Sequence, residues 1–208
     1  MLVLIRRGTS FGRRLSITDP RAGLQSKKMP RYVAFLRALN VGGHHVVKMA
    51  ALRGLFSDLG FAGVETFIAS GNVIFEAKSA AAGPLEKKIE AHLAAALGHS
   101  VAVFLRTTGD LRAISAHRPF DDAALESAQA LNIGFCKEKL SPAAIAAVMA
   151  LTTPVDDFHV NGRELYWLCR NRQSDSTFSN NRFERAINGV STLRGASTVA
   201  KLAAMYSS

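Results

Sequence analysis

The spacing of apolar positions in the first half of the chain alternates between strand-like and helix-like stretches. Tyr32–Leu36 is an uninterrupted apolar run, which indicates a strand buried on both faces. From Lys48 the apolar residues take helical spacing, and Gly60 is placed to end that helix. Further strands are predicted at 64–68, 73–75 and 101–105, with a helix that Pro84 opens and Gly98 ends, and a short helix capped by Asp110 through Ala116. The order is βαββαβ followed by a helix.

The second half of the chain repeats this order, beginning roughly 100 residues later. Leu131–Cys136 reads as a strand, and Ser141 is expected to cap the helix that follows it. Asn161-Gly162 lies between two alternating stretches and suits a type I′ hairpin turn. The remaining predicted elements are a helix at 178–187 ended by Asn188-Gly189, a strand at 190–193 and a helix at 196–206. The segment Pro119–Gln129 is the predicted connection between the halves.

The repeated order is that of a ferredoxin-like sandwich, with helices on one face of an antiparallel sheet. The sequence therefore predicts an α+β fold of two tandem ferredoxin-like βαββαβ units, each followed by an extra helix. We expect a first unit at 29–118 and a second at 119–208, after an N-terminal extension at 1–28. The halves share element order but little sequence, so duplication is inferred from topology alone.

The net charge of +10 is concentrated at the N-terminus. Residues 1–28 account for +6 of it, which leaves +4 for the other 180 residues. An Arg-rich, acid-poor leader suits an organellar transit peptide, but the packed pattern begins abruptly at Arg31, which favours Met29 as the true start and 1–28 as an upstream extension or disordered tail. No apolar run reaches bilayer length, so we expect a soluble, cytoplasmic protein without a membrane partner.

Metal and thiol chemistry find little support in the sequence. Cys136 and Cys169 lie in apolar strand-like runs, so both are expected to be buried, free thiols. His44 and His45 are adjacent, and adjacent side chains rarely converge on one ion; no HExxH-type partner follows them. We predict no metal site and no cofactor.

One loop carries the main candidate for ligand binding. Arg37, Asn40, Gly42, Gly43 and Lys48 lie between a strand end and a helix start, where a glycine-rich turn can present backbone N–H groups to an anion. The loop matches neither the GxGxxG nor the Walker A pattern. The alternative is that the glycines only permit a tight connection, with both cations pointing to water.

Two further polar groups are candidates for the same site: Ser70, Gly71 and Asn72, and Thr192, Arg194 and Lys201. The alternative for the first group is a purely local turn, since Asn and Gly favour turns intrinsically. The alternative for the second is helix capping, because hydroxyls at a helix start commonly cap it, with Ser197 or Thr198 as the expected N-cap of the last helix. No Ser/His/Asp order and no carboxylate pairing stands out, so no catalytic residue is predicted and enzymatic activity stays open.

The segment "YVAFLRALNVGG…VKMAALRGLFSDLGFAGVETFIASGNVIF", residues 32–75, closely resembles the start of bacterial domain-of-unknown-function family 1697. That family begins with a strand, an R-G-I-N-V-G-G type loop, V-K-M opening a helix, then L-G-F and S-G-N-V-I/V-F. "STLRGASTVAKLAAM" resembles the family's T-T-R-N-W-N-T-V-x-K-L segment, and Pro119-Phe120 fits its middle. The resemblance covers residues 30 to about 205 and implies a duplicated α+β fold without an assigned reaction.

The chain departs from the family pattern at several positions. Ala38 stands where the family usually has glycine, and residues 195–197, Gly-Ala-Ser, replace its usual Asn-Trp-Asn. If the Asn-Trp-Asn segment forms part of a ligand site, the site of this member is altered. His44 and His45 stand where the family tends to have Lys, Asn or Arg, which disfavours a catalytic role for them.

Three functions remain open from the sequence. The first is binding of, or catalysis on, a small polar or anionic ligand at the loop after the first strand. The second is a nucleic-acid-binding module, which would need aromatics such as Tyr32, Phe35 and Phe75 displayed on a sheet face. The modest charge of residues 29–208 and the lack of an RNP1 motif argue against it, and core packing explains these aromatics better. The third is an interaction or structural role without catalysis.

Overall fold

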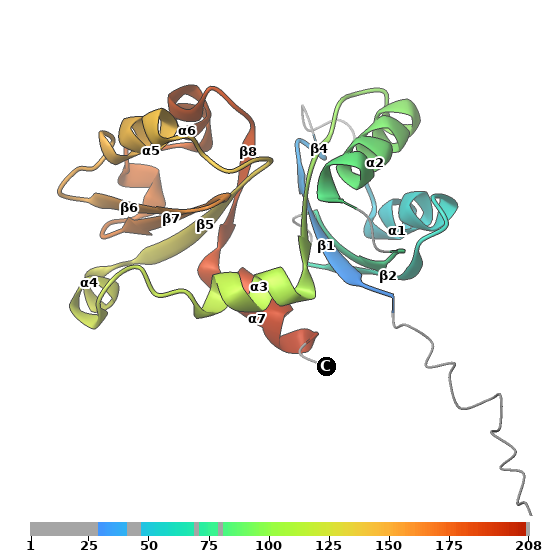
Figure 1. The fold of residues 1–208 in the computed structure, drawn as a ribbon, viewed down its shortest axis with the longest axis horizontal. Helices are drawn as coiled ribbons and strands as arrows, with labels where there is room; N and C mark the ends of the chain where they lie inside the picture. The colour runs from blue at the N-terminus through green and yellow to red at the C-terminus, as the bar shows by residue number, and fades with distance from the viewer. Residues whose placement is uncertain (1–28, 41–46, 69–70, 79–80, 207–208) are drawn as a thin grey trace, which may run out of the picture.

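Each half of the chain builds one four-stranded antiparallel sheet (Figure 1). The computed structural model describes residues 29–40, 47–68, 71–78 and 81–206. The first sheet has the order β2-β3-β1-β4 and the second the order β6-β7-β5-β8. The strands are β1 (Arg31–Arg37), β2 (Ala62–Phe67), β3 (Asn72–Glu76), β4 (Ala102–Thr107), β5 (Ala130–Cys136), β6 (Asp156–Asn161), β7 (Glu164–Cys169) and β8 (Ser191–Gly195).

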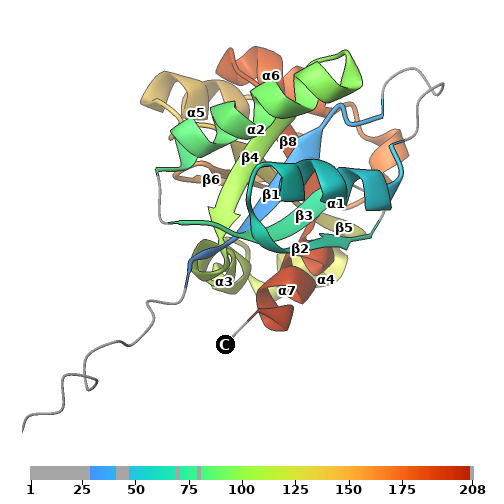
Figure 2. The ribbon, with the colours of Figure 1, turned by 90° about the vertical axis from the view of Figure 1, so that its right-hand side faces the viewer.

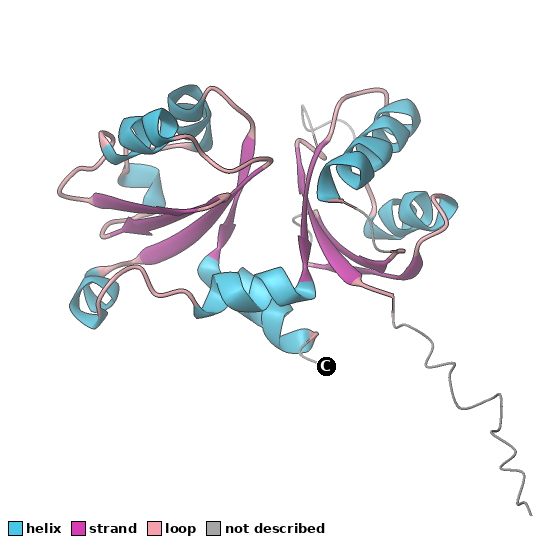
Figure 3. Cartoon of the chain, viewed as in Figure 1, coloured by secondary structure: helices cyan, strands magenta, loops and turns pink. Residues whose placement is uncertain are grey.

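Helices cover the outer face of each sheet (Figure 1), and Figure 2 looks onto the helices of the first sheet. In the first half these are α1 (Met49–Asp58) and α2 (Ala82–Leu97), and in the second half α5 (Pro142–Met149) and α6 (Asn180–Ile187). The inner faces of the sheets are turned toward each other, with α3 (Thr108–Ala116) and α7 (Ala196–Met205) packed together beneath them (Figure 3). The short α4 (Asp122–Ser127) lies below the second sheet.

The hydrophobic core has three parts, because each sheet buries both of its faces. One lies between the first sheet and its helices, and one between the second sheet and its helices. The third joins the halves, where inner-face side chains such as Phe35, Phe135 and Tyr166 pack with α3 and α7. A strand buried on both faces reads as a continuous apolar run, which is why Tyr32–Leu36 lacks alternation.

The two sheets also repeat in register. Val33 pairs with Arg106 and, in the other sheet, Ile133 pairs with Arg194. The predicted α+β class is confirmed, as two four-stranded antiparallel sheets with flanking helices. The boundary at 118/119 and an origin by duplication stay predictions.

Two local predictions at helix starts were wrong. Thr107, not Asp110, caps α3, and the two residues form a reciprocal capping box. Gly195 occupies the N-cap position of α7 without a side-chain bond, so neither Ser197 nor Thr198 caps it. The connection 119–129 contains α4, whose start Asp121 caps. Ser141 does cap α5, as predicted.

The β6–β7 hairpin turns one residue later than predicted. Asn161 still pairs with Glu164, so Gly162 and Arg163 form the two-residue loop. Gly162 has a φ of 65°, whereas Arg163 is not among the positive-φ residues. A single positive φ at the first loop position fits a type II′ turn and not the predicted type I′.

Both cysteines are buried and free, as predicted. Burial raises the pKa of the Cys136 thiol to about 12 and also raises the pKa of Cys169, so both stay protonated at neutral pH. None of the helices in the described part of the chain has the length and apolar character needed to cross a bilayer.

Candidate functional site

Arg106 of β4 reaches from the first sheet into the second. Its Nε donates to Glu164 Oε1 at 2.7 Å, and one terminal nitrogen donates to the Cys136 carbonyl at 3.0 Å. The guanidinium carbon lies 5.3 Å from the centre of the Phe135 ring. Burial lowers the pKa of Arg106 most, the Glu164 carboxylate opposes this shift, and the positive charge of Arg163 adds to it.

Arg194 of β8 makes the corresponding contacts in the opposite direction, from the second sheet into the first. Its Nε donates to Asn72 Oδ1, and a terminal nitrogen donates to the Leu36 carbonyl, both at 2.8 Å. The other terminal nitrogen donates to Thr192 Oγ1 at 2.8 Å. Burial lowers the pKa of Arg194 to about 10. The structure thus brings together three residues that the sequence singled out, since Arg194 is hydrogen-bonded to both Asn72 and Thr192.

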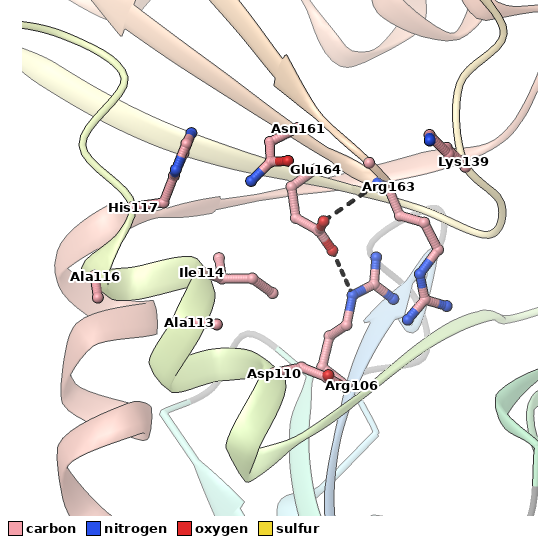
Figure 4. A pocket seen from close by; sticks show the side chains of 11 residues that line it. Arg106, Asp110, Ala113, Ile114, Ala116, His117, Lys139, Asn161, Arg163 and Glu164 are labelled. Carbon is pink, nitrogen blue, oxygen red and sulfur yellow. Dashed lines mark hydrogen bonds and ion pairs between the residues drawn. The ribbon is translucent and has the colours of Figure 1, made fainter.

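A pocket of about 550 Å³ opens beside Arg106, between α3 and the β6–β7 hairpin (Figure 4). Its walls come from both halves of the chain: α3 and its C-terminal end on one side, and the hairpin with the residues after β5 on the other. The lining residues are Arg106, Asp110, Ala113, Ile114, Ala116, His117, Lys139, Asn161, Gly162, Arg163 and Glu164.

The two carboxylates of this pocket are already engaged by protein groups. Asp110 accepts the backbone N–H of Thr107 at 2.9 Å in the capping box, and Glu164 is paired with Arg106. Arg163 and Lys139 have no carboxylate partner among the residues that the structure describes. The lining therefore holds three cationic side chains, Arg106, Lys139 and Arg163, against two carboxylates, which leaves an excess of one positive charge.

His117 closes one side of the pocket. Its ring packs against the rings of His159 and Tyr166, with centroids 5.2 and 5.0 Å away. The Tyr166 hydroxyl donates to the Ile114 carbonyl at 3.0 Å, which ties β7 to α3. Burial lowers the pKa of His159, and the charge of His117 adds to that shift. Within the described ranges, His117 Nε2 is buried without a hydrogen-bond partner.

The predicted loop after the first strand is described only at its ends. Arg37 pairs with Glu184 of α6, so it points to the second half and not into the loop. Asn40 Oδ1 accepts the backbone N–H of Val47 at 2.9 Å, and Lys48 is the N-cap residue of α1. Gly42 and Gly43, together with the neighbouring histidines His44 and His45, lie outside the described residues.

The remaining predicted ligand-binding residues are Ser70, Gly71 and Lys201. Gly71 has a φ of 71°, and a Cβ there would lie 3.2 Å from the Leu36 Cβ, so the turn needs glycine. Ser70 lies outside the described residues. Lys201 is exposed on α7 and takes no part in the hydrogen bonds that Arg194 makes with Asn72, Thr192 and Leu36. A ligand-binding role for these residues stays a prediction.

Sequence reasoning missed the residues of the pocket, although the internal repeat carried a usable signal. Arg106 holds the register position that Arg194 holds in the other sheet. Glu164 begins β7 opposite Phe135, as Asn72 begins β3 opposite Phe35. Transferring the predicted Asn72 and Arg194 through the repeat would have indicated Glu164 and Arg106.

The strand aromatics are buried, which bears on nucleic-acid binding. Tyr32 is 4% exposed, and Phe35 and Phe75 are fully buried. An RRM stacks bases on aromatics that its sheet exposes. Core packing is therefore confirmed as the explanation for these three side chains.

The family model "Protein of unknown function (DUF1697)" matches residues 29–166. A solved structure, that of the conserved bacterial protein SP0830 from Streptococcus pneumoniae, is similar in fold with a TM-score of 0.69 and 25% identity. The alignment covers 86% of this chain and 99% of that one. No curated protein matches the chain.

Proposed function

The chain belongs to the DUF1697 family, and on this premise we propose that it binds a small anionic ligand in the pocket between α3 and the β6–β7 hairpin. The observation that carries the proposal is the placement of Arg163 and Lys139 in one pocket whose carboxylates are both engaged by other groups.

The charge arrangement supports an anion more than a neutral ligand. Burial lowers the pKa of Arg106 most, and the nearby positive charge of Arg163 lowers it further, because like charges repel in a region of low dielectric constant. A bound anion would relieve that repulsion and accept hydrogen bonds from Arg163 and Lys139. Phosphate and carboxylate groups match the fork of an arginine, because both accept two parallel N–H bonds.

The pocket is also preorganised for binding. The Arg106–Glu164 ion pair links the two sheets, and the Tyr166 hydroxyl donates a hydrogen bond to the Ile114 carbonyl of α3. The walls of the pocket are therefore in place before a ligand binds. A volume of about 550 Å³ accommodates a metabolite-sized molecule. The loop after β1 stays a second predicted location for such a ligand.

Thermal shift and calorimetry test the proposal. Inorganic phosphate, pyrophosphate and citrate are expected to raise the melting temperature, because a ligand that binds only the folded state stabilises it. Arg163→Ala should weaken binding by about tenfold or more, since a hydrogen bond to a charged group contributes about 1.5–3 kcal/mol. Lys139→Ala should weaken it in the same direction.

Arg172→Ala is the matched control. Arg172 is exposed and follows β7 at the end opposite the hairpin, so the variant removes the same charge far from the pocket. Binding should be unchanged in this variant. Equal losses in Arg163→Ala and Arg172→Ala would reduce the effect to net charge, and no shift with any of the three anions would refute the proposal.

A further inference from the structure

A second cavity adjoins the proposed anion pocket. It has a volume of about 470 Å³ and lies where the connection from α3 to α4 passes β5. Ala116 and His117 line both cavities, so the two share a wall at the C-terminal end of α3. The rest of the second cavity is more apolar, because Pro119, Phe120, Leu125 and Leu131 line it. Ser115 and Arg118 also contribute to its lining, and Arg118 is paired with Asp122.

These apolar side chains are fixed in place and only partly buried. Phe120, Leu125 and Leu131 are each of intermediate exposure. Phe120 packs against the core between the sheets, and Leu131 belongs to β5, so both are anchored. Leu125 is carried by α4, whose N-terminus is fixed by a 2.7 Å bond from the Ala124 N–H to Asp121 Oδ1. The cavity therefore offers rigid apolar walls to a ligand.

We propose that the ligand is an anionic amphiphile, with its charged group at Arg163 and Lys139 and an alkyl or acyl chain that passes His117 into the second cavity. The inference rests on the proposed anion site and adds the chemical class of the ligand. A phosphate or carboxylate alone would occupy only part of the charged pocket and would leave the adjoining apolar walls in water. A chain attached to that group would remove Phe120, Leu125 and Leu131 from water, which is favourable in proportion to the apolar area covered.

A series of phosphate monoesters tests the chain requirement on the unmodified protein. Isothermal titration calorimetry with inorganic phosphate, butyl phosphate, hexyl phosphate and octyl phosphate keeps the head group constant, at concentrations below micelle formation. Affinity should rise by about fourfold for each added methylene that is buried, which corresponds to about 0.8 kcal/mol per CH₂. The rise should end once the cavity is filled.

Variants on α4 localise the chain. Leu125→Glu places a carboxylate in the second cavity and should weaken octyl phosphate binding without changing the affinity for inorganic phosphate. Ala123→Glu is the matched control, because Ala123 is exposed on the same helix and outside the cavity lining. Arg163→Ala should weaken the binding of every phosphate in the series.

The outcomes separate the two proposals. If inorganic phosphate binds and chain length has no effect, the amphiphile is wrong and the anion site stands. If neither inorganic phosphate nor octyl phosphate binds, the anion site fails and the amphiphile fails with it. If octyl phosphate binds equally well to the Arg163→Ala protein, the chain binds without the head group, which overturns the two-cavity ligand. The chain-length series is measured on the unmodified protein, so it tests the amphiphile proposal even if the Leu125→Glu variant does not fold.

Discussion

The rings of Phe35 and Phe135 stack across the two sheets, with centroids 4.1 Å apart and planes inclined by 18°. Phe35 comes from β1 and Phe135 from β5, the two central strands that occupy corresponding positions in their sheets. Each ring also carries a guanidinium group from the opposite sheet, Arg194 over Phe35 and Arg106 over Phe135. The junction of the halves is therefore built from one motif used twice.

Phe135→Ala should lower the free energy of unfolding by about 3–5 kcal/mol, because it removes a fully buried ring and leaves a cavity between the sheets. Urea denaturation followed by circular dichroism measures the change. Met205→Ala is the control, since Met205 is 55% exposed and its truncation should alter stability by no more than about 0.5 kcal/mol. Equal losses in the two variants would contradict the importance of the stacked pair.

Glu164→Ala should destabilise the protein by about 3–5 kcal/mol, since it leaves the buried Arg106 without its ion-pair partner. Glu164→Gln should cost clearly less, because an amide oxygen can still accept the Nε–H bond, as Asn72 does for Arg194. Chemical denaturation of both variants provides the comparison. The interpretation is wrong if the glutamine variant loses as much stability as the alanine variant.

Ala38→Gly should stabilise the protein by about 0.5–1 kcal/mol, because Ala38 has a φ of 60°, where a Cβ is strained. This strain also gives a physical reason for the glycine usual in the family at that position. Ala91→Gly, at an exposed position in the middle of α2, should instead destabilise by about 1 kcal/mol. Melting temperatures of the two variants should therefore move in opposite directions; a loss in both would exclude strain at Ala38.

Acidification should destabilise the fold through His159. Its pKa in the folded protein lies below the ordinary value near 6.5, so the unfolded chain binds the proton more tightly. This contribution to stability is present above pH 6.5 and is lost as the pH falls through the window below it. Melting temperatures measured at about pH 7.5 and 5.5 should show the loss, and His159→Gln should reduce it. An undiminished loss in the variant would assign the effect to other groups.

Much of the fold follows from local patterns in the sequence. The run Tyr32–Leu36, the glycines at 60 and 98, and Ser141 before Pro142 each act through a few neighbouring residues, and the corresponding elements formed. Local patterns failed where several caps or turns were chemically available. Thr107 and Asp110 both suit a helix start, and the choice between Asn161-Gly162 and Gly162-Arg163 depends on the register of the two strands.

The class of the fold could be predicted from the sequence, because strand and helix periods, turn residues and caps are properties of short segments. Which polar groups meet depends instead on the packing of distant segments. Arg106 and Glu164 are 58 positions apart, and Lys139 and His117 come from segments on opposite sides of the pocket. Their approach depends on how the two inner sheet faces pack, and no local spacing encodes that contact. The same packing places the charged pocket beside an apolar one, with His117 between them.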